Sequence, residues 1–359
     1  MIVLAAPDKF RGTATADEVC DAIAAATGTT ERGGRTIRRP MADGGEGMLD
    51  ALGGGNRVTR VSGPNGGPVE AAWRLEPETG LAVIEAARAC GLLLAGGSEV
   101  NDPMAASSRG VGELLVAAVR AGAGRVLLGV GGSACTDGGL PAIDALRAAG
   151  VLQPDPDGAP DGGPDGGPEG ARGGGRLPVP VSVCCDVTTP FLDAARVYGP
   201  QKGATAAQVD ALTERLAALS RRYREEFGVD VDALPGAGAA GGLAGGLAAV
   251  GARLVPGFAT VAAEVGFDSL LAQSELVVTG EGRFDRTSLA GKVVGEVVAR
   301  ATAAGRPVLV VAGVTDPSAV AGLPDGVSVV DLTQRFGPAR ALTDTTSCIR
   351  EAVATELRP

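Results

Sequence analysis

Histidine is missing from this sequence of 359 residues, and aromatic residues make up only 3% of it. The first absence removes the usual general base and every Ser-His-Asp arrangement, so proton transfer falls to Asp, Glu, Lys, Tyr or Cys. The second leaves few rings on which nucleic-acid bases could stack. Because the formal net charge is −10, the chain also lacks the basic footprint of a phosphate-backbone partner. We therefore predict that no nucleic acid is bound.

The six cysteines form no C-x-x-C pair, and without histidine they complete no common zinc site. We interpret them as small buried thiols in a reducing compartment. No apolar run is long enough to span a bilayer, and Asp8 and Lys9 interrupt the first run before a signal-peptide core develops. The sequence thus predicts a soluble cytoplasmic protein with no membrane partner.

Short β-branched runs alternate with alanine-rich helical stretches along the whole chain. Continuous apolar runs suit buried, largely parallel strands, and the alternation predicts an α/β fold with ligands at the carboxyl ends of strands. The length favours two α/β domains. The predicted strands are Ile2–Ala5, Arg57–Val61, Leu81–Glu85, Arg125–Val130, Val179–Cys185, Leu276–Thr279, Val308–Ala312 and Val327–Asp331. The predicted helices are Ala16–Ala26, which has a capping box of Thr15 and Glu18, Val111–Ala121, Leu140–Ala149, Ala206–Phe227 and Val293–Ala304.

The segment 154–176 consists almost entirely of Pro, Gly and Asp. It cannot bury enough apolar surface to fold, so we predict a disordered surface loop. Calcium binding by its aspartates is an alternative, but their spacing is not that of an EF-hand.

Five segments bring carboxylates together with glycines near the ends of strands. They are 5–12 (AAPDKFRG), 42–47 (ADGGEG), 131–139 (GGSACTDGG), Asp186 after its strand, and 279–282 (TGEG) with Asp285 and Lys292. An ordinary strand-to-helix turn explains any one of them, but five in one chain indicate a functional site.

Glycine-rich turns at helix N-termini bind phosphate through backbone N–H groups and need no net positive charge. Phosphoryl transfer also needs carboxylates for Mg²⁺, a cation for developing charge, and a carboxylate that orients or deprotonates the acceptor hydroxyl. The carboxylates of these segments, with Lys9, Arg109, Lys202 and Lys292, offer all three roles.

Two standard nucleotide-binding motifs bear on this interpretation. Lys292 belongs to no Walker A motif, because Arg286 stands in place of its first glycine and Val293 in place of Ser or Thr. The segment 236–241 (GAGAAG) matches G-x-G-x-x-G but follows no predicted strand, which weakens NAD binding. Close packing of small residues and a phosphate contact both stay open for it.

The motifs APDKFRG, ADGGEG, SSRGVGE, GVGGSACTDGG, CDV-x-x-P, YGPQKGA, GAGAAGGLAGG and TGEGRFD-x-x-S-x-x-GK resemble, in the same order, those of bacterial type 1 glycerate kinases. The resemblance implies phosphorylation of D-glycerate with ATP and Mg²⁺, usually at the 2-hydroxyl. It also implies two α/β domains: a Rossmann-like one from residues 1–62 and 272–359, and a second, inserted one at 63–271.

Roles follow as hypotheses from this resemblance and from the residue chemistry. Catalysis is assigned to Asp186, Asp8, Lys9 and Lys292, and substrate binding to Arg109, Lys202, Gln201, Arg11 and Ser108. Nucleotide contacts are assigned to Gly131, Gly132, Ser133, Gly138, Gly139, Gly241, Gly242, Gly280, Glu281 and Gly282. Magnesium is assigned to Asp43, Asp137 and Asp285.

The chain departs from the family pattern at Arg11, usually Lys, at Thr189, usually Asn, and in a shortened stretch at 191–197. These changes leave three alternatives: a kinase of another small hydroxy-carboxylate, phosphorylation of the glycerate 3-hydroxyl, and a non-catalytic relative that senses ligands.

Overall fold

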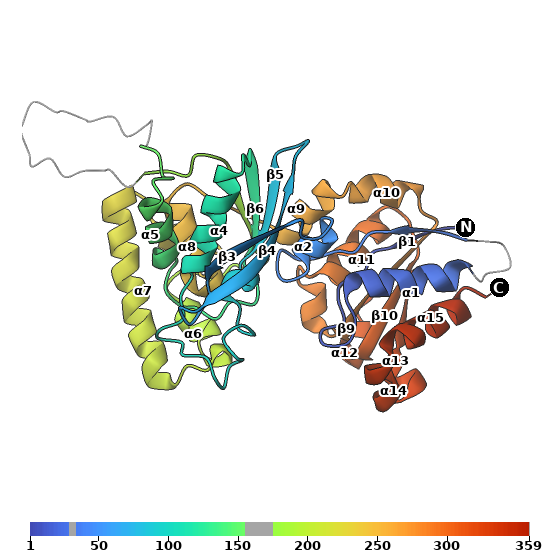
Figure 1. Cartoon of the computed structure of the whole chain (residues 1–359). Coiled ribbons are helices and arrows are strands. Elements are labelled where there is room, and N and C mark those ends of the chain that lie inside the picture. Colours follow the sequence, from blue (N-terminus) through green and yellow to red (C-terminus); the bar gives the residue numbers. More distant parts are fainter. Residues whose placement is uncertain (29–33, 155–174, 359) are drawn as a thin grey trace, which may run out of the picture. The chain divides into compact units, whose positions relative to one another are not determined.

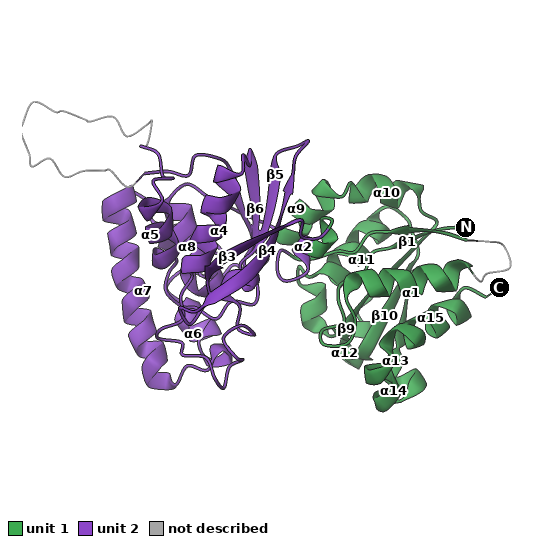
Figure 2. Cartoon of the chain, in the orientation of Figure 1, with its two compact units in different colours: residues 1–43, 50–53, 257–359 green, residues 44–49, 54–256 purple. Residues whose placement is uncertain are grey.

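The computed structural model describes residues 1–28, 34–154 and 175–358. The chain divides into two compact units, coloured in Figure 2. Unit 1 contains residues 1–43, 50–53 and 257–359, and unit 2 contains residues 44–49 and 54–256. The bounds expected from the sequence differ at both junctions, since 54–62 lie in unit 2 and 257–271 in unit 1. The predicted loop at 154–176 lies almost wholly outside the described residues.

Unit 1 is built on a five-stranded parallel sheet in the order β11-β10-β9-β1-β2. The first strand of the chain pairs with a strand from its last quarter, with Ala5 opposite Val278. Segments from both ends of the chain therefore share one sheet. The strands are β1 (Ile2–Ala5), β2 (Arg35–Arg38), β9 (Leu276–Phe284), β10 (Val308–Thr315) and β11 (Val327–Asp331).

Helices α1 and α15 pack against each other and lie in front of this sheet in Figure 1. The predicted capping box begins α1: Thr15 N–H donates to Glu18 Oε2 (2.8 Å), and Glu18 N–H donates to Thr15 Oγ1 (3.2 Å). The unit 1 helices are α1 (Ala16–Gly28), α9 (Gly257–Glu264), α10 (Phe267–Gln273), η4 (Arg286–Leu289), α11 (Val293–Ala303), α12 (Pro317–Val320), α13 (Leu332–Phe336), α14 (Pro338–Thr343) and α15 (Thr345–Glu356). The short α2 (Met48–Ala51) contains residues of both units.

Unit 2 carries a six-stranded mixed sheet in the order β3-β4-β5-β6-β7-β8. The pairs β3–β4 and β4–β5 are antiparallel, and the rest are parallel. The strands are β3 (Arg57–Ser62), β4 (Pro68–Glu76), β5 (Leu81–Glu85), β6 (Arg125–Gly129), β7 (Val181–Cys184) and β8 (Arg253–Val255).

The core of unit 2 includes Phe191 and Tyr223, whose rings meet edge to face at 6.1 Å. Tyr223 lies on the long helix α7 and donates its hydroxyl proton to the carbonyl oxygen of Gly138 (2.8 Å). The unit 2 helices are α3 (Ala87–Cys90), α4 (Arg109–Arg120), α5 (Leu140–Ala148), α6 (Ala194–Tyr198), η1 (Pro200–Lys202), α7 (Ala206–Phe227), η2 (Val231–Ala233), η3 (Ala239–Gly242) and α8 (Leu243–Ala249).

The predicted α/β class is confirmed, and the eight predicted strands all exist. The strands β2, β4 and β8 were not predicted. The prediction that a strand ends at Thr279 is wrong, because β9 continues to Phe284 and pairs with β10 as far as Thr315. Gly280 and Gly282 therefore lie in a strand rather than in a turn.

Candidate functional site

Two carboxylates lie together at the carboxyl end of the unit 1 sheet. Asp8 follows β1 and Glu281 belongs to the neighbouring β9, and Asp8 N–H donates to the carbonyl oxygen of Gly280 (2.9 Å). Parallel neighbours bring their carboxyl ends to the same edge, which explains why residues 273 positions apart meet.

Burial and the charge of a neighbouring carboxylate raise the pKa of each group. The pKa of Asp8 rises to about 6 because the carboxyl is buried and Asp43 is close. The pKa of Glu281 rises to about 7, mainly through burial and further through the charge of Asp8. Within the described part of the chain, Glu281 Oε1 is buried and accepts no hydrogen bond. A buried acceptor of this kind is costly and suits a cation or donor from a ligand.

Three cations of unit 1 act on this pair of carboxylates. Lys9 and Arg11 lower the pKa of Asp8, and Lys292 lowers that of Glu281, each through its charge. Lys292 stands directly before α11 and donates from Nζ to Thr287 Oγ1 (2.9 Å). Anionic groups at this sheet edge would therefore find positive charge beside the carboxylates.

Asp285 is engaged locally instead. Its Oδ1 accepts hydrogen bonds from Thr287 N–H (2.8 Å) and Thr287 Oγ1 (2.6 Å), and these bonds hold its pKa below the usual range. It caps the short helix η4.

The turn after β6 in unit 2 presents three successive backbone donors. None of the residues that the structure describes accepts a hydrogen bond from the N–H groups of Gly131, Gly132 or Ser133. Gly132 has φ +70°, a left-handed conformation that L side chains rarely adopt. Successive N–H groups in such a turn form a concavity for anions.

The second half of the same turn is used internally. Asp137 is 7% exposed, and its two oxygens accept from Ser108 N–H (2.6 Å) and Gly139 N–H (3.0 Å). Gly138 N–H donates to the carbonyl oxygen of Gly241 (3.0 Å). The donors of Gly138 and Gly139 are thus already committed.

Lys202 lies beneath this turn and is only 4% exposed. Its Nζ donates to Ser133 Oγ (3.1 Å) and to the carbonyl oxygen of Cys135 (2.7 Å), and burial lowers its pKa. Asn101 Nδ2 donates to the carbonyl oxygens of Lys202 (2.9 Å) and Ala134 (3.3 Å). A buried polar hub therefore fixes the turn.

Glycines of the segment 236–246 serve close packing. A side chain at Gly241 would come within 2.1 Å of the carbonyl oxygen of Cys135, and one at Gly246 within 2.2 Å of that of Gly138. Helix α8 follows η2 and η3 rather than a strand, so the strand that a dinucleotide motif requires is missing from this described segment.

The segment 44–47 also packs against the turn. Val130 N–H donates to the carbonyl oxygen of Gly44 (3.1 Å), and a side chain at Gly131 would lie 2.7 Å from Gly45 Cα. Glu85, 2% exposed at the end of β5, accepts from Gly47 N–H (2.7 Å).

Comparison with known proteins decides the family. A model described as the glycerate kinase family matches residues 3–356. The chain belongs to this family. It is 38% identical over 342 residues to a glycerate kinase of Halalkalibacterium halodurans, covering 87% of this chain and 85% of the relative. It is 35% identical over 337 residues to the glycerate 2-kinase of Escherichia coli, with the same coverage.

A solved structure agrees with this membership of the glycerate kinase family. The crystal structure of a protein assigned as glycerate kinase 2 from Salmonella typhimurium LT2 matches with a TM-score of 0.76 and 30% identity. The match covers 99% of this chain and 98% of the other. The resemblance seen in the sequence motifs is confirmed, and the protein is a kinase of this family.

The structure distributes the remaining predicted residues of the kinase between its units. Arg11 is exposed in unit 1, while Gln201 is exposed in unit 2. Ser108 is fully buried, and Arg109 at the start of α4 pairs with Glu113 (2.9 Å). Asp186 is half-buried beyond the end of β7. Gly242 lies against Phe191 and Gly138.

Glu85 and Asn101 were not predicted. Glu85 ends a fully buried predicted strand, and an acidic residue in such a position is a signal for a buried partner. Asn101 carries no such signal, because its partners are 33 and 101 residues away.

The described residues contain neither a ready-made metal site nor a membrane-spanning helix. No group of three or more Cys, Asp or Glu side chains there forms a metal site by itself. Nor does any helix in that part of the chain have the length and apolar character needed to cross a membrane.

Proposed function

We propose that this kinase phosphorylates D-glycerate with ATP at the 2-hydroxyl, giving 2-phosphoglycerate in the cytoplasm. The observation that carries the proposal is the carboxylate pair of Asp8 and Glu281, set among cations in a chain of the glycerate kinase family. Phosphoryl transfer depends on such positioned carboxylates and cations rather than on covalent chemistry.

The carboxylates of Asp8, Glu281 and the nearby Asp43 fit Mg²⁺ better than those of Asp137 and Asp285 do. Mg²⁺ is usually held by one or two carboxylates and by phosphate oxygens, and Glu281 Oε1 is a buried acceptor without a hydrogen bond in the described structure. The carboxylate oxygens of Asp137 and Asp285 instead accept hydrogen bonds from backbone N–H groups. When bound, the ion would neutralise charge on the phosphates.

The cations and backbone donors take the complementary role. Lys9 and Lys292 stabilise negative charge on the transferring group beside the carboxylates. In unit 2, the N–H groups of Gly131–Ser133 bind an anionic phosphate oxygen, and the buried ammonium of Lys202 adds positive charge beneath them.

Asp186 is our candidate for the group that orients or deprotonates the acceptor hydroxyl. It stands beyond the carboxyl end of a parallel strand, where α/β proteins gather their ligands. No histidine competes for this role.

The test is phosphorus NMR of purified protein with ATP, Mg²⁺ and D-glycerate. We expect a 2-phosphoglycerate signal that the variants Asp186→Asn and Asp8→Asn lose by about two orders of magnitude or more, as for loss of a general base or of electrostatic stabilisation. Asp193→Asn is the matched control, because this half-buried aspartate caps α6 without a side-chain bond. ATP binding without turnover on any acceptor would instead support a non-catalytic relative.

The departures near Asp186 favour one alternative, a different acceptor. Thr189 bonds Tyr198 Oη (2.7 Å) and so helps to shape this region. A panel of small hydroxy-carboxylates, with the phosphorylated position read by the same NMR experiment, separates 2-phosphorylation from 3-phosphorylation and from another substrate.

A further inference from the structure

Glu85 is a buried carboxylate at the carboxyl end of β5, and its side chain is only 2% exposed. Its Oε1 accepts hydrogen bonds from two backbone donors, Gly47 N–H (2.7 Å) and Leu49 N–H (2.9 Å). Its Oε2 accepts from Arg88 Nε (3.0 Å). Because a buried carboxylate is costly unless its oxygens are satisfied, these bonds fix Glu85 and the backbone of 47–49 to each other.

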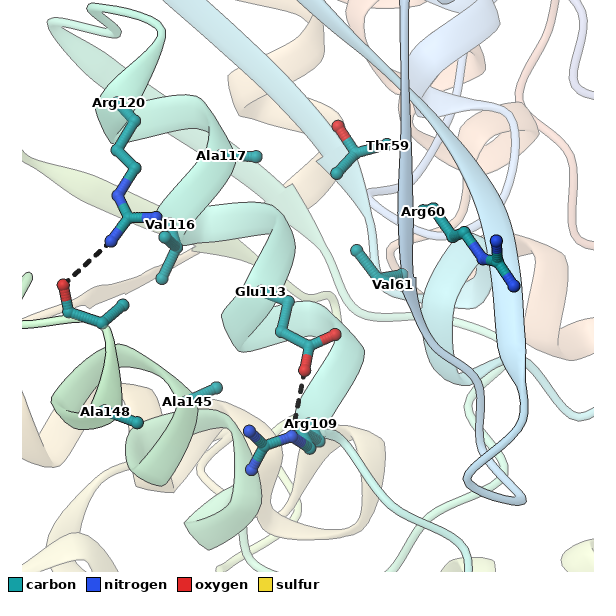
Figure 3. Close-up of a pocket in the computed structure, with 11 residues that line it drawn as sticks. Thr59, Arg60, Val61, Arg109, Glu113, Val116, Ala117, Arg120, Ala145 and Ala148 are labelled. Atoms are coloured by element: carbon teal, nitrogen blue, oxygen red, sulfur yellow. Dashed lines mark hydrogen bonds and ion pairs between the residues drawn. The ribbon is translucent and has the colours of Figure 1, made fainter.

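Glu85 is too deeply buried to touch a substrate itself. Figure 3 shows the contrast with another carboxylate of unit 2: Glu113 pairs with Arg109 in a groove of about 620 Å³, and the Glu113 side chain is 28% exposed. A small molecule in that groove would reach Glu113. Glu85 instead acts on a ligand only through the residues that it holds in place.

The segment 44–47, which Glu85 holds at one end, lies across the carboxyl ends of neighbouring parallel strands of unit 2. Val130 N–H, directly after β6, donates to the carbonyl oxygen of Gly44 (3.1 Å). A side chain at Gly44 would come within 2.9 Å of the carbonyl oxygen of Cys184, the last residue of β7. The segment thus contacts the ends of β5, β6 and β7, which is the sheet edge where α/β proteins gather ligands.

The same segment packs against the turn whose backbone donors we assign to a phosphate oxygen. A side chain at Gly131 would lie 2.7 Å from Gly45 Cα, and one at Gly132 would lie 2.4 Å from Glu46 Oε1. The contact therefore leaves no room for even a methyl group. Because close-packed groups transmit strain, a shift of the segment would displace the turn as well.

We propose that Glu85 is a positioning residue for nucleotide binding: by fixing Gly47 and Leu49, it keeps the segment 44–47 against the turn 131–133 and so aligns the N–H donors of that turn. The inference rests on the proposed function, because it assumes that the turn binds a phosphate of ATP. A carboxylate suits the task, since one of its oxygens can accept from two donors and its charge strengthens both bonds.

The experiment measures the KM for ATP in the full-length protein and, independently of turnover, the affinity for β,γ-methylene ATP by calorimetry. Glu85→Leu removes both acceptor oxygens. We expect it to raise the KM for ATP and the dissociation constant of the analogue about tenfold or more, as for loss of charge-assisted hydrogen bonds. The value of kcat should change less, because the turn contributes binding rather than the acceptor base.

Two smaller changes at Glu85 test whether reach matters. Glu85→Asp keeps the charge but withdraws the carboxylate by one methylene, so ATP binding should weaken in the same direction as in Glu85→Leu. Glu85→Gln keeps an oxygen that can accept from Gly47 and Leu49, so ATP binding should stay within about threefold of that of the unaltered protein.

Glu76→Leu is the matched control. Glu76 also ends a strand of this sheet and pairs with Arg74 (2.5 Å), but it lies opposite Leu81 at the amino end of β5. Its replacement should leave the KM for ATP unchanged. Melting curves identify the folded variants, and kinetics are compared well below the lowest melting temperature.

Unchanged ATP binding in the folded Glu85→Leu and Glu85→Asp proteins would overturn the proposal and leave Glu85 a purely structural residue. An equal loss in Glu85→Gln and Glu85→Asp would also overturn it, because reach to the two backbone donors would then not matter. Gly132→Ala distinguishes this failure from that of the proposed function. If Gly132→Ala weakens binding of the analogue and the Glu85 variants do not, only the role of Glu85 fails; if neither does, the turn binds no phosphate and both fail.

Discussion

Replacement of Lys202 by methionine removes the ammonium that supports the glycine-rich turn of unit 2. The change leaves Ser133 Oγ and the carbonyl oxygen of Cys135 without this donor in a buried place. Each unsatisfied buried group costs about 1–3 kcal/mol, so the two groups together cost about 2–6 kcal/mol. Methionine no longer carries the burial penalty that lowers the pKa of Lys202, which offsets part of the loss.

We therefore expect the free energy of unfolding to fall by about 2–4 kcal/mol, in the lower part of that range. For a domain of this size the melting temperature should fall by about 4–16 °C. Calorimetry measures both, with Gln201→Met as the control, because Gln201 precedes Lys202 on η1 but is exposed.

A second readout tests the turn itself. The hydrogen bond between the Cys135 and Cys90 thiols, together with burial, raises the pKa of Cys135 well above its ordinary value, so the native thiol should resist iodoacetamide. In Lys202→Met the loosened turn should expose Cys135 to alkylation, which mass spectrometry assigns to the residue. A loss of stability below about 1 kcal/mol, with Cys135 still protected, would refute a supporting role for Lys202, since even one unsatisfied buried group costs more.

Three other predictions concern the carboxylates around Asp8 in unit 1 and the glycine-rich turn of unit 2. The pKa of Asp8 is raised to about 6, so the free energy that this carboxyl contributes to stability is fully present below pH 4 and is lost as the pH rises through 6. Asp8→Asn should therefore raise the free energy of unfolding by about 1–3 kcal/mol at pH 8 and leave it unchanged near pH 3.5. An equal gain at both pH values in denaturant titrations would contradict this. Asp43→Asn should move the acidic limb of the pH profile of kcat/KM to lower pH, because the charge of Asp43 raises the pKa of Asp8. If the limb does not move, it does not report the ionisation of Asp8. Gly132→Ala places a Cβ 2.4 Å from Glu46 Oε1 at φ +70°. It should lower the free energy of unfolding by about 1–2 kcal/mol and raise the KM for ATP. Gly150→Ala is the control that should leave KM unchanged, because Gly150 also has positive φ but lies in open space.

Much of the fold could be predicted because it depends on local signals. Apolar runs such as Val308–Ala312 pack on both faces of a sheet, and the Thr15–Glu18 capping box satisfies backbone donors within one turn. The strand β4 was missed because strands were predicted from continuous apolar runs. Its polar and apolar residues instead alternate between a more exposed and a more buried face.

The candidate site was predictable only in part. Motif chemistry predicted a catalytic role for Asp8 and a nucleotide contact for Glu281, but the proximity of the two carboxylates depends on the pairing of β1 with β9 across most of the chain. In the sequence, Asp137 resembles Asp8, because both lie in a segment with glycines that follows a predicted strand. Its carboxylate is instead occupied by Ser108 and Gly139, which only the packing of α4 beside the turn reveals.

The sequence by itself determined the class of chemistry: without histidine, and with carboxylates, lysines and glycines at strand ends, it indicated phosphoryl transfer on an α/β scaffold. Tertiary structure alone decided which of these polar groups are occupied by partners within the protein. Lys202 illustrates the reason, since a lysine on a Gly-Pro turn is ordinarily solvated, and here it is buried by segments that lie 67 to 101 residues away. Burial is a property of distant partners, so a local pattern of residues does not determine it.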